Sequence, residues 1–376
     1  MLELSLNGAE LLLPDGMQRG DLGIAAGRLT GAGSGRRVDL SGFRVLPGIV
    51  DLHGDGFERH LAPRRGAMKD LSTGLVSAEA ELAANGITTA YLAQFWSWEG
   101  GMRGRDFALR FLRALRDYRA AGTDLRAQLR FELFMLDDYD AFEAAVAEFG
   151  VRYVVFNDHL PHEALARGKR PPRLTGQALK GGRSPEAHLA LMNDMHMHMA
   201  SVAPAIGALA ARLAETGVVL GSHDDDTAGL RRAWHGRGVT IAEFPETRAA
   251  AQVARGQGDA VVLGAPNVVR GGSHSGNASA AELLREGLCD ALASDYHYPA
   301  PRQAALILAD EIGIERAWAL VSEGPARVLG LQDRGVIAPG KRADLVVLDG
   351  AGRIGATIAG GRVTHLSGAV AERFLG

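Results

Sequence analysis

The sequence predicts an α/β protein, a (β/α)8 TIM barrel with a small β-sandwich domain formed by both termini. Strand-like apolar runs alternate with helical patterns through the middle of the 376-residue chain, and such alternation is typical of a parallel sheet. Both ends instead hold short strand-like pieces separated by Gly and Asp, which favours one shared β-domain. We therefore expect residues 1–45 and 331–376 to form that domain around a barrel over residues 46–330.

Strand-like runs in the predicted barrel body match the number that a closed barrel needs. In chain order they are VLPGIVDLH, GITTAYLAQF, LRAQLRFELF, VRYVVFNDH, GVVLGSHDD, TIAEFP, AVVLGAPN and CDALASDY. Helical patterns such as STGLVSAEAELAAN, YDAFEAAVAEFG and SAAELLREG lie between them. Barrels of this kind carry their chemistry at the carboxyl ends of the strands, so the residues there are the candidates for function.

Composition limits the class of protein. The chain is 47% hydrophobic and 23% charged, with a net charge of −3, which is ordinary for a soluble globular protein and gives no nucleic-acid or membrane signature. The single cysteine, Cys289, excludes an intrachain disulfide and a cysteine zinc cluster. The start of the chain has no signal-peptide pattern. We expect a cytoplasmic protein that binds a small molecule, with a homodimer as one possible assembly.

The first predicted strand ends in His53 and Asp55. Residues i and i+2 of a strand point to the same side, so both side chains can aim at one divalent ion. A single H-x-D triplet also occurs by chance, and His53 could instead cap the strand end. The pattern gains weight because later strands end in the same residue types.

Imidazole and carboxylate groups at strand ends are the usual ligands of zinc, manganese or iron. Glu132 could instead pair with Arg130 or Arg152, and His159 could bond a loop backbone. We predict one or two divalent ions, zinc first among these metals. The predicted ligands are His53, Asp55, Glu132, His159, His223 and Asp295.

Asp295 is predicted to be catalytic as well, taking a proton from a metal-bound water whose pKa falls to about 7. His274 is the second predicted catalytic residue. Glu243 either contacts substrate or pairs with a neighbouring cation. One of the two acids after His223, Asp224 or Asp225, is expected to cap the next helix.

Other residues of the predicted helices and strand ends have less specific readings. His196 and His198 do not share a helix face, so we interpret them as surface or packing residues. The aromatic residues Trp96 and Trp98 are either a pocket wall or loop packing.

Two segments favour an anionic substrate. Residues 164–185 hold six Lys or Arg residues, Lys169 and Arg170 among them, and no acid; this run suits a lid, or else it is a solvated basic face. The run RGGSHSGN adds paired glycines whose N–H groups can approach a ligand. The predicted substrate-binding residues are Arg270, Ser273 and Asn277 of this run, Lys169 and Arg170 of the basic run, and Glu243.

Several motifs match a known family. The split β-domain, PGIVDLH, the strand-eight aspartate and GKRADLVVLD resemble the amidohydrolase superfamily. More narrowly, GSHDDDTA, IAEFPET, GAPNVVRGGSHSGNASAAEL, ASDYHYPA and LQDRGVIAPGKRADLV are similar to the PhnM family of α-D-ribose 1-methylphosphonate 5-triphosphate diphosphatases. The resemblance implies hydrolysis of a ribose triphosphate with release of pyrophosphate. It places His53 and Asp55 on a metal pair, and it leaves open whether Glu132 or His159 bridges.

Two segments depart from that family pattern: HGDGFERHLAPRRGA after the first strand and AQFWSWEGG at the second. A paralogue acting on a related phosphorylated or phosphonylated compound therefore stays open. The alternative enzyme is an amidohydrolase acting on a C–N bond of a small anionic substrate, as a deacetylase, deaminase or cyclic amidase. A metal-free scaffold is a third possibility.

Overall fold

The structure, a computed structural model, describes residues 3–31, 33, 35–62, 70–271 and 278–376. The chain divides into two compact units. Unit 1 comprises residues 1–92, 118–126 and 262–376, and unit 2 comprises residues 93–117 and 127–261.

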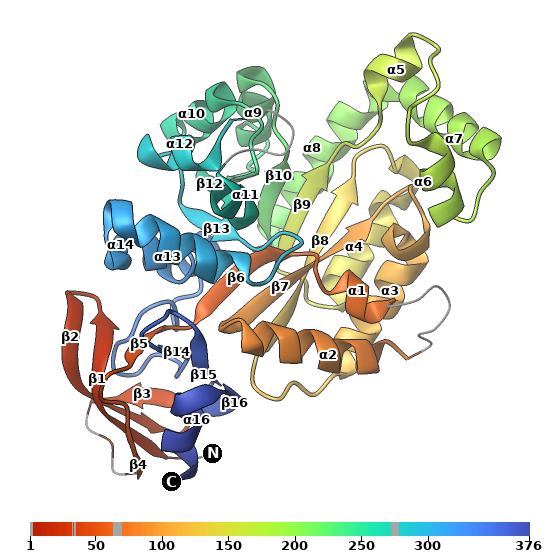
Figure 1. Cartoon of the computed structure of the whole chain (residues 1–376). Coiled ribbons are helices and arrows are strands. Elements are labelled where there is room, and N and C mark those ends of the chain that lie inside the picture. Colours follow the sequence, from red (N-terminus) through yellow and green to blue (C-terminus); the bar gives the residue numbers. More distant parts are fainter. Residues whose placement is uncertain (1–2, 32, 34, 63–69, 272–277) are drawn as a thin grey trace. The chain divides into compact units, whose positions relative to one another are not determined.

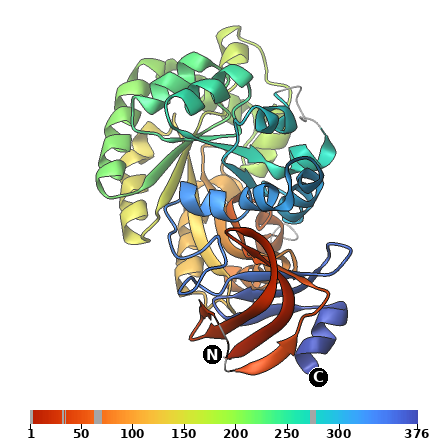
Figure 2. The ribbon, with the colours of Figure 1, turned by 90° about the vertical axis from the view of Figure 1, so that its left-hand side faces the viewer.

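One mixed sheet is built from both ends of the chain and belongs to unit 1 (Figure 1). Its strands follow the order β16-β15-β14-β5-β1-β2-β3, with β4 paired to β1. The strands are β1 (Leu4–Leu13), β2 (Gly16–Ala25), β3 (Arg28–Thr30), β4 (Arg36–Asp39), β5 (Arg44–Pro47), β14 (Leu345–Leu348), β15 (Ile354–Ala359) and β16 (Arg362–Leu366). Figure 2 shows the N- and C-terminal ends of the chain at this sheet, so the predicted joining of the termini is confirmed.

This terminal sheet has a single apolar core. Leu4 and Leu6 of β1, Val347 of β14 and Ile358 of β15 are buried together with Phe374 of the last helix. Alternation along each strand sends these side chains to one face. The predicted sandwich is therefore realised as one connected sheet, in which β1 is antiparallel to β2 and parallel to β4 and β5.

The second sheet is the predicted barrel. Its order is β13-β12-β11-β10-β9-β8-β7-β6, and a parallel bridge between Gly54 and Asp295 links its two ends. Every predicted run supplies one of these strands, which confirms the fold class. The strands are β6 (Ile49–Gly54), β7 (Ile87–Trp96), β8 (Asp124–Glu132), β9 (Tyr153–Asn157), β10 (Val219–His223), β11 (Ile241–Glu243), β12 (Ala260–Gly264) and β13 (Ala291–Ala293).

The run VLPGIVDLH differs from its prediction, because it forms two strands that belong to different sheets. β5 pairs with β14 in the terminal sheet, whereas β6 pairs with β7 in the barrel. Gly48 lies between them and donates its N–H to the carbonyl of Asp344 at 2.8 Å. A Cβ at this position would lie 2.3 Å from Oγ1 of Thr88, so the junction requires glycine.

Helices lie between the strands, as the alternating pattern predicts. They are α1 (Glu58–Leu61), α2 (Leu71–Ala84), α3 (Arg105–Asp117), α4 (Tyr139–Glu148), α5 (His162–Ala166), α6 (Leu174–Lys180), α7 (Pro185–Met197), α8 (Met199–Glu215), α9 (Ala228–His235), α10 (Arg248–Gly256), α11 (Ala265–Arg270), α12 (Ala280–Arg285), α13 (Ala300–Ile312), α14 (Ile314–Ala319), α15 (Glu323–Val328) and α16 (Gly368–Leu375), with 3₁₀ turns η1 (Gly101–Arg103) and η2 (Leu136–Asp138). Within the described ranges no single helix could span a membrane; only α7 and α8, bent by 73° where they meet, pass that test as a pair.

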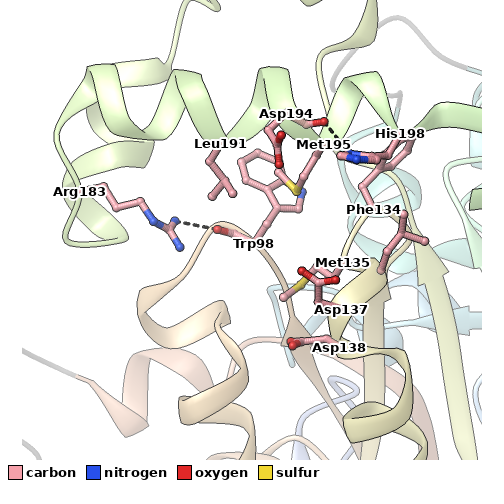
Figure 3. A pocket seen from close by; sticks show the side chains of 11 residues that line it. Trp98, Phe134, Met135, Asp137, Asp138, Arg183, Leu191, Asp194, Met195 and His198 are labelled. Atoms are coloured by element: carbon pink, nitrogen blue, oxygen red, sulfur yellow. Dashed lines mark hydrogen bonds between the residues drawn. The ribbon is translucent and has the colours of Figure 1, made fainter. Parts of the chain in front are cut away.

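The two tryptophans after β7 have different surroundings in unit 2. Trp96 is fully buried, donates from Nε1 to Oδ2 of Asp138 at 2.8 Å and meets Phe142 edge to face. It is therefore a packing residue. Trp98 instead lines a cavity beside α7 (Figure 3), which favours the pocket-wall interpretation for this residue alone.

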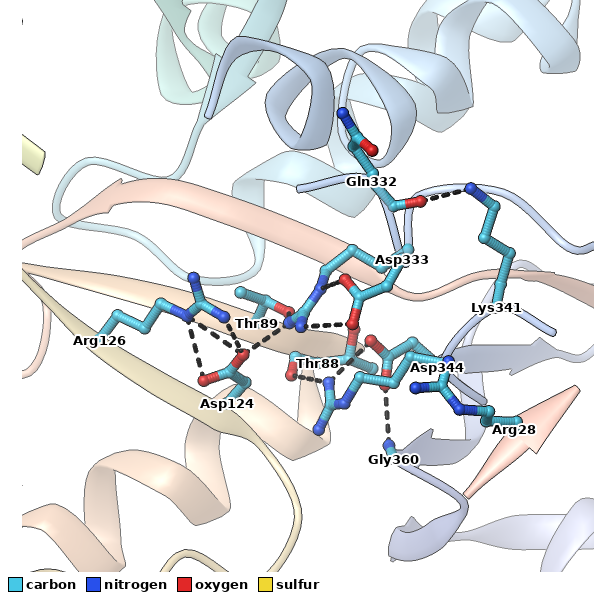
Figure 4. A network of polar contacts seen from close by, with 12 residues as sticks. Arg28, Thr88, Thr89, Asp124, Arg126, Gln332, Asp333, Lys341, Asp344 and Gly360 are labelled. Carbon is cyan, nitrogen blue, oxygen red and sulfur yellow. Dashed lines mark hydrogen bonds and ion pairs between the residues drawn. The ribbon is translucent and has the colours of Figure 1, made fainter. Parts of the chain in front are cut away.

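Polar contacts around Thr89, Asp124 and Asp333 connect several parts of unit 1 (Figure 4). The Nη1 atom of Arg334 donates to Oδ2 of Asp124 and to Oγ1 of Thr89, each at 2.7 Å, and its Nε donates to Asp333 at 2.9 Å. Burial pushes the pKa of Asp124 upward, but Arg126 and Arg334 outweigh burial and hold that pKa below its usual value.

We predict that Arg334→Leu lowers the free energy of unfolding by about 2 kcal/mol, because Thr89 and Asp124 lose a buried charged donor while Arg126 still pairs with Asp124. The urea midpoint of the purified chain measures the effect. Arg353→Leu is the control, since the Arg353 side chain is 79% exposed in its pair with Asp349 and exposed pairs contribute little. Equal midpoints for the two variants would contradict the prediction.

Candidate metal centre

Three strand ends of unit 2 bring together a carboxylate and two imidazoles. Glu132 is the last residue of β8, His159 follows β9 by two residues, and His223 is the last residue of β10. The strands reach this point through buried apolar side chains, and Leu133 donates its N–H to the carbonyl of Asn157 at 3.0 Å. The polar groups therefore stand where the apolar strands end, as the sequence predicts.

Glu132 is almost completely buried, and its partner is His159. The backbone N–H of His159 donates to Oε2 at 3.1 Å, and its ring Nδ1 contacts Oε1. Burial raises the pKa of Glu132, but His159 outweighs it, so the net pKa is lowered. The predicted alternatives, Arg130 and Arg152, are not hydrogen-bond partners of Glu132 here, since Arg152 donates to the carbonyl of Thr216 and Arg130 contacts His223.

The contact with Glu132 has consequences for His159. Burial lowers the pKa of the imidazole, and the adjacent carboxylate of Glu132 more than compensates, so the pKa is raised. Because Nδ1 is engaged by Glu132, Nε2 is the ring nitrogen that remains for an ion. Glu132 thus orients His159 through both the backbone and the ring.

His223 is held on both sides. Its Nδ1 lies 2.9 Å from Oδ2 of Asp224, and its Nε2 lies 3.0 Å from Nη2 of Arg130. Burial raises the pKa of Asp224, but His223 and Arg130 overcome burial and lower that pKa to about 2. Asp224 has a left-handed backbone, with φ of 58°, which asparagine and aspartate tolerate better than other side chains.

The donor set suits a divalent transition metal. His159, His223 and Asp224 each offer one ligand atom, and these atoms lie within 4.8 Å of one another. Two imidazoles and a carboxylate fit zinc, manganese or iron. An ion bound through Nε2 of His223 would replace the present contact with Arg130, so these residues fit a metal on that condition.

Glu243, which the sequence assigns to substrate binding, is fully buried at the end of β11. Its Oε1 accepts from Nε2 of Gln128 at 2.7 Å and from the hydroxyl of Tyr153 at 2.5 Å. These two partners of the Glu243 Oε1 are an amide and a phenol. Its backbone carbonyl also accepts the N–H of Asp224 at 3.0 Å, which supports the turn after His223.

The remaining predicted ligands lie together in unit 1. His53 and Asp55 flank Gly54, which bridges to Asp295. Asp295 donates its N–H to the carbonyl of His53 at 3.0 Å, and Asp55 donates to the carbonyl of Asp295 at 2.9 Å. Asp295 has φ of 55°, and such strain in a residue other than glycine is frequent at functional sites.

Sequence reasoning did not single out Asp51, which holds this arrangement. Asp51 is fully buried; its Oδ1 accepts the N–H of Ser294 at 2.9 Å and its Oδ2 accepts the Ser294 hydroxyl at 2.6 Å. Burial raises the pKa of Asp51. The available signal was position, because Asp51 and His53 are spaced by two on β6 and Asp55 directly follows the end of that strand.

The predicted anion-binding residues have varied positions. Arg270 ends α11 and donates to the carbonyl of Pro266 at 3.4 Å. The predicted catalytic His274 lies outside the described residues, as do the predicted substrate-binding Ser273 and Asn277.

The basic run 164–185 is partly neutralised by acids that flank it. Arg170 pairs with Glu186 at 3.5 Å, and Arg167 pairs with Glu163 at 2.7 Å. Lys169 is exposed in the connection between α5 and α6. The run also contains α6, a helix that the Gly- and Pro-rich composition did not predict; buried Leu174 and Ala178 place one of its faces inside unit 2.

The predicted cap by Asp224 or Asp225 is wrong. Thr227 caps α9, and its hydroxyl accepts the N–H of Leu230 at 3.1 Å. Asp225 is buried and accepts instead from Ser222 at 2.8 Å and Arg231 at 3.1 Å. A buried guanidinium requires such a carboxylate, and this requirement outweighs the local preference for an N-cap.

His196 in the last turn of α7 and His198 directly after that helix lie away from these strand ends in sequence and bond locally. The Nδ1 of His198 lies 2.8 Å from the carbonyl of Asp194, and the Nδ1 of His196 lies 2.8 Å from that of His162. These contacts agree with the packing and surface roles that the sequence suggests.

Comparisons with known proteins identify relatives along most of the chain. A model of the amidohydrolase family matches residues 68–365. The α-D-ribose 1-methylphosphonate 5-triphosphate diphosphatase of Escherichia coli (strain K12) is 32% identical over 359 residues, which cover 91% of this chain and 94% of the relative.

Solved structures share the fold. An amidohydrolase structure has a TM-score of 0.68 at 14% identity, with 98% of this chain and 100% of that chain covered. An N-acetyl-D-glucosamine-6-phosphate deacetylase from Mycobacterium smegmatis has a TM-score of 0.64 at 17% identity, with coverage of 98% and 100%. At these identities the likeness concerns the fold alone.

We predict that Ser294→Ala lowers the free energy of unfolding by about 2 kcal/mol, because buried Asp51 loses a charge-assisted hydrogen bond. Ser367→Ala is the matched control, since the Ser367 hydroxyl donates to the neutral carbonyl of Ile354 and a neutral bond contributes about 1 kcal/mol. Urea titration of both variants compares them. A smaller loss for Ser294→Ala than for Ser367→Ala would show that Asp51 does not depend on this contact.

Proposed function

Because the chain belongs to the amidohydrolase family, we propose that it is a metal-dependent hydrolase that releases pyrophosphate from the 5-triphosphate of a phosphorylated ribose phosphonate. The observation that carries the proposal is the 32% identity with the Escherichia coli diphosphatase over nearly the whole of both chains. The proposed substrate is small and phosphorylated or phosphonylated, and a cytoplasmic location stays a prediction.

The proposed metal ligands are the side chains that the sequence places at the strand ends, with zinc as the first candidate and one or two ions bound. They are His53, Asp55, Glu132, His159, His223 and Asp295. When bound, a divalent ion of this class polarises an oxygen of the electrophile and lowers the pKa of a coordinated water to about 7.

The chain's own residues have separate proposed tasks. Asp295 accepts a proton from the attacking water, and His274 is the second catalytic group. Glu132 keeps His159 in one tautomer by engaging Nδ1. Asp51 holds Ser294 and thereby the backbone that presents Asp295.

Substrate anions are proposed to meet the basic groups. Lys169, Arg170 and Arg270 would supply charge, while Ser273 and Asn277 would supply hydrogen-bond donors. Glu243 is the remaining proposed substrate-binding residue. Because it is fully buried, it would act on the substrate indirectly, through its hydrogen bonds with Gln128 and Tyr153.

Hydrolysis of a C–N bond in a small anionic substrate is the second candidate. The pairing of Arg167 and Arg170 with acids favours it, because paired guanidinium groups leave less positive charge for a triphosphate. The same proton acceptor and metal ligands serve either reaction.

The reaction itself is tested by phosphorus NMR on the metal-loaded chain with a ribose 5-triphosphate bearing a phosphonate. We expect pyrophosphate to appear with the wild-type chain and not with Asp295→Asn, while Asp295→Asn keeps its metal by elemental analysis. Full turnover in Asp295→Asn would remove this residue as the proton acceptor. Ammonia or a free amine from an amide substrate, without pyrophosphate, would favour the second candidate.

Metal binding is tested separately from turnover. We expect His159→Ala and His53→Ala to bind less zinc than the wild-type chain by elemental analysis after dialysis, because each removes a proposed imidazole ligand. His198→Ala is the control, since its ring bonds a backbone carbonyl in α7. The number of ions lost per chain tells whether one or two are held. Unchanged zinc in both variants would contradict the proposed ligand set.

The basic run is tested by charge reversal. We expect Lys169→Glu with Arg170→Glu to raise KM for a phosphorylated substrate about tenfold, with a smaller change for a neutral analogue. The control carries the same charge change at exposed Arg232 and Arg255 of α9 and α10. Equal KM changes for the two double variants would assign the run to a solvated basic face.

A further inference from the structure

A cavity in unit 2 opens beside the carboxyl end of β8. Its volume is about 350 Å³, which lies at the lower end of the range typical of small-molecule sites. Phe134, two residues after Glu132 in sequence, contributes to its wall, and so do the next four residues of the connection after β8. Trp98 comes from the connection after β7, and Met195 comes from α7 (Figure 3).

The wall of this cavity is aromatic and firmly held. Trp98 is 3% exposed, and its ring lies 5.4 Å from that of His188. Arg183 donates from Nη1 to the carbonyls of Trp98 and Glu99 at 2.7 and 3.3 Å. This guanidinium nitrogen is therefore engaged by the backbone. Among the described residues the indole N–H of Trp98 has no hydrogen-bond partner. This N–H is therefore available to donate a hydrogen bond to a ligand.

The charged groups that line the cavity are three carboxylates and one guanidinium, that of Arg183. Asp137 and Asp194 line it and are exposed. Asp138 also lines it, but its carboxylate is already engaged by Arg105 at 3.0 Å and by Trp96. The rings of Trp98 and Phe134 can attract a cation through their π faces and can pack against apolar surface. The carboxylates of Asp137 and Asp194 add Coulomb attraction for the same cation.

We propose that this cavity binds an organic ammonium group with an apolar body. The inference deepens the proposed function and rests on it in one respect only: the connection that follows Glu132 lines the cavity, so we assign the ammonium group to a non-reacting end of the substrate. The carboxylates that line the cavity would repel a triphosphate. We therefore assign the anionic end of the substrate to the basic run 164–185. The loop that supplies Trp98 is one of the two segments that depart from the family pattern, as expected for a determinant of specificity.

The test is calorimetric binding to the full metal-loaded chain with three probes of one skeleton: 2-phenylethylammonium, 2-phenylethanol and 3-phenylpropionate. We expect the ammonium to bind about tenfold more tightly than the carboxylate, with the alcohol between them. Asp194→Asn should reduce ammonium affinity about threefold to tenfold and leave the alcohol unchanged. Asp140→Asn on α4, an exposed acid away from the cavity lining, is the control and should change neither.

Equal affinity for all three probes, or equal losses for Asp194→Asn and Asp140→Asn, would overturn the proposal. Asp194 is exposed, so its substitution does not threaten folding, and a Trp98→Phe variant adds a second test by weakening the ammonium more than the carboxylate. Binding is measured without turnover. Pyrophosphate release with no ammonium preference would therefore overturn the cavity assignment alone, whereas ammonium preference with no pyrophosphate would overturn the proposed reaction alone.

Discussion

Buried carboxylates need partners, and this requirement shapes both sets of strand ends. In unit 1 the carboxylate of Asp51 is fully buried and meets the N–H and hydroxyl of Ser294. Those two bonds fix the register of β6 against β13, and the register places Asp295 beside the backbone of His53. Without a partner for Asp51, a buried charge would cost several kcal/mol, so the positions of the proposed unit 1 ligands depend on this pairing.

Unit 2 obeys the same constraint with a different outcome. Glu132 is 1% exposed and takes its partner from the next strand end, His159. That choice leaves one ring nitrogen of His159 for an ion and leaves Arg130 to contact His223. Glu132, which the sequence predicts to be a metal ligand, thus orients His159 instead. The donor set that remains for an ion is His159, His223 and Asp224.

Charge separates the two proposed substrate ends. The basic run presents Lys169 and Arg170 at its surface, although flanking acids neutralise part of it. The cavity beside β8 presents Asp194 and the ring of Trp98. A substrate with an anionic and a cationic end satisfies both, whereas a purely anionic one uses only the first. The identity of the Escherichia coli relative therefore supports a reaction class more directly than it supports one substrate.

The sequence by itself determined the eight barrel strands, the joining of the termini and the residue types at the strand ends, because strand alternation and apolar runs are local properties that pattern reveals. It also pointed to the family. Tertiary structure decided the partners. Asp51 and Ser294 are 243 residues apart, Asp225 pairs with Arg231 instead of capping a helix, and Trp96 packs where Trp98 lines a cavity. Such choices depend on register and on competition for burial between distant segments, and no local pattern encodes them.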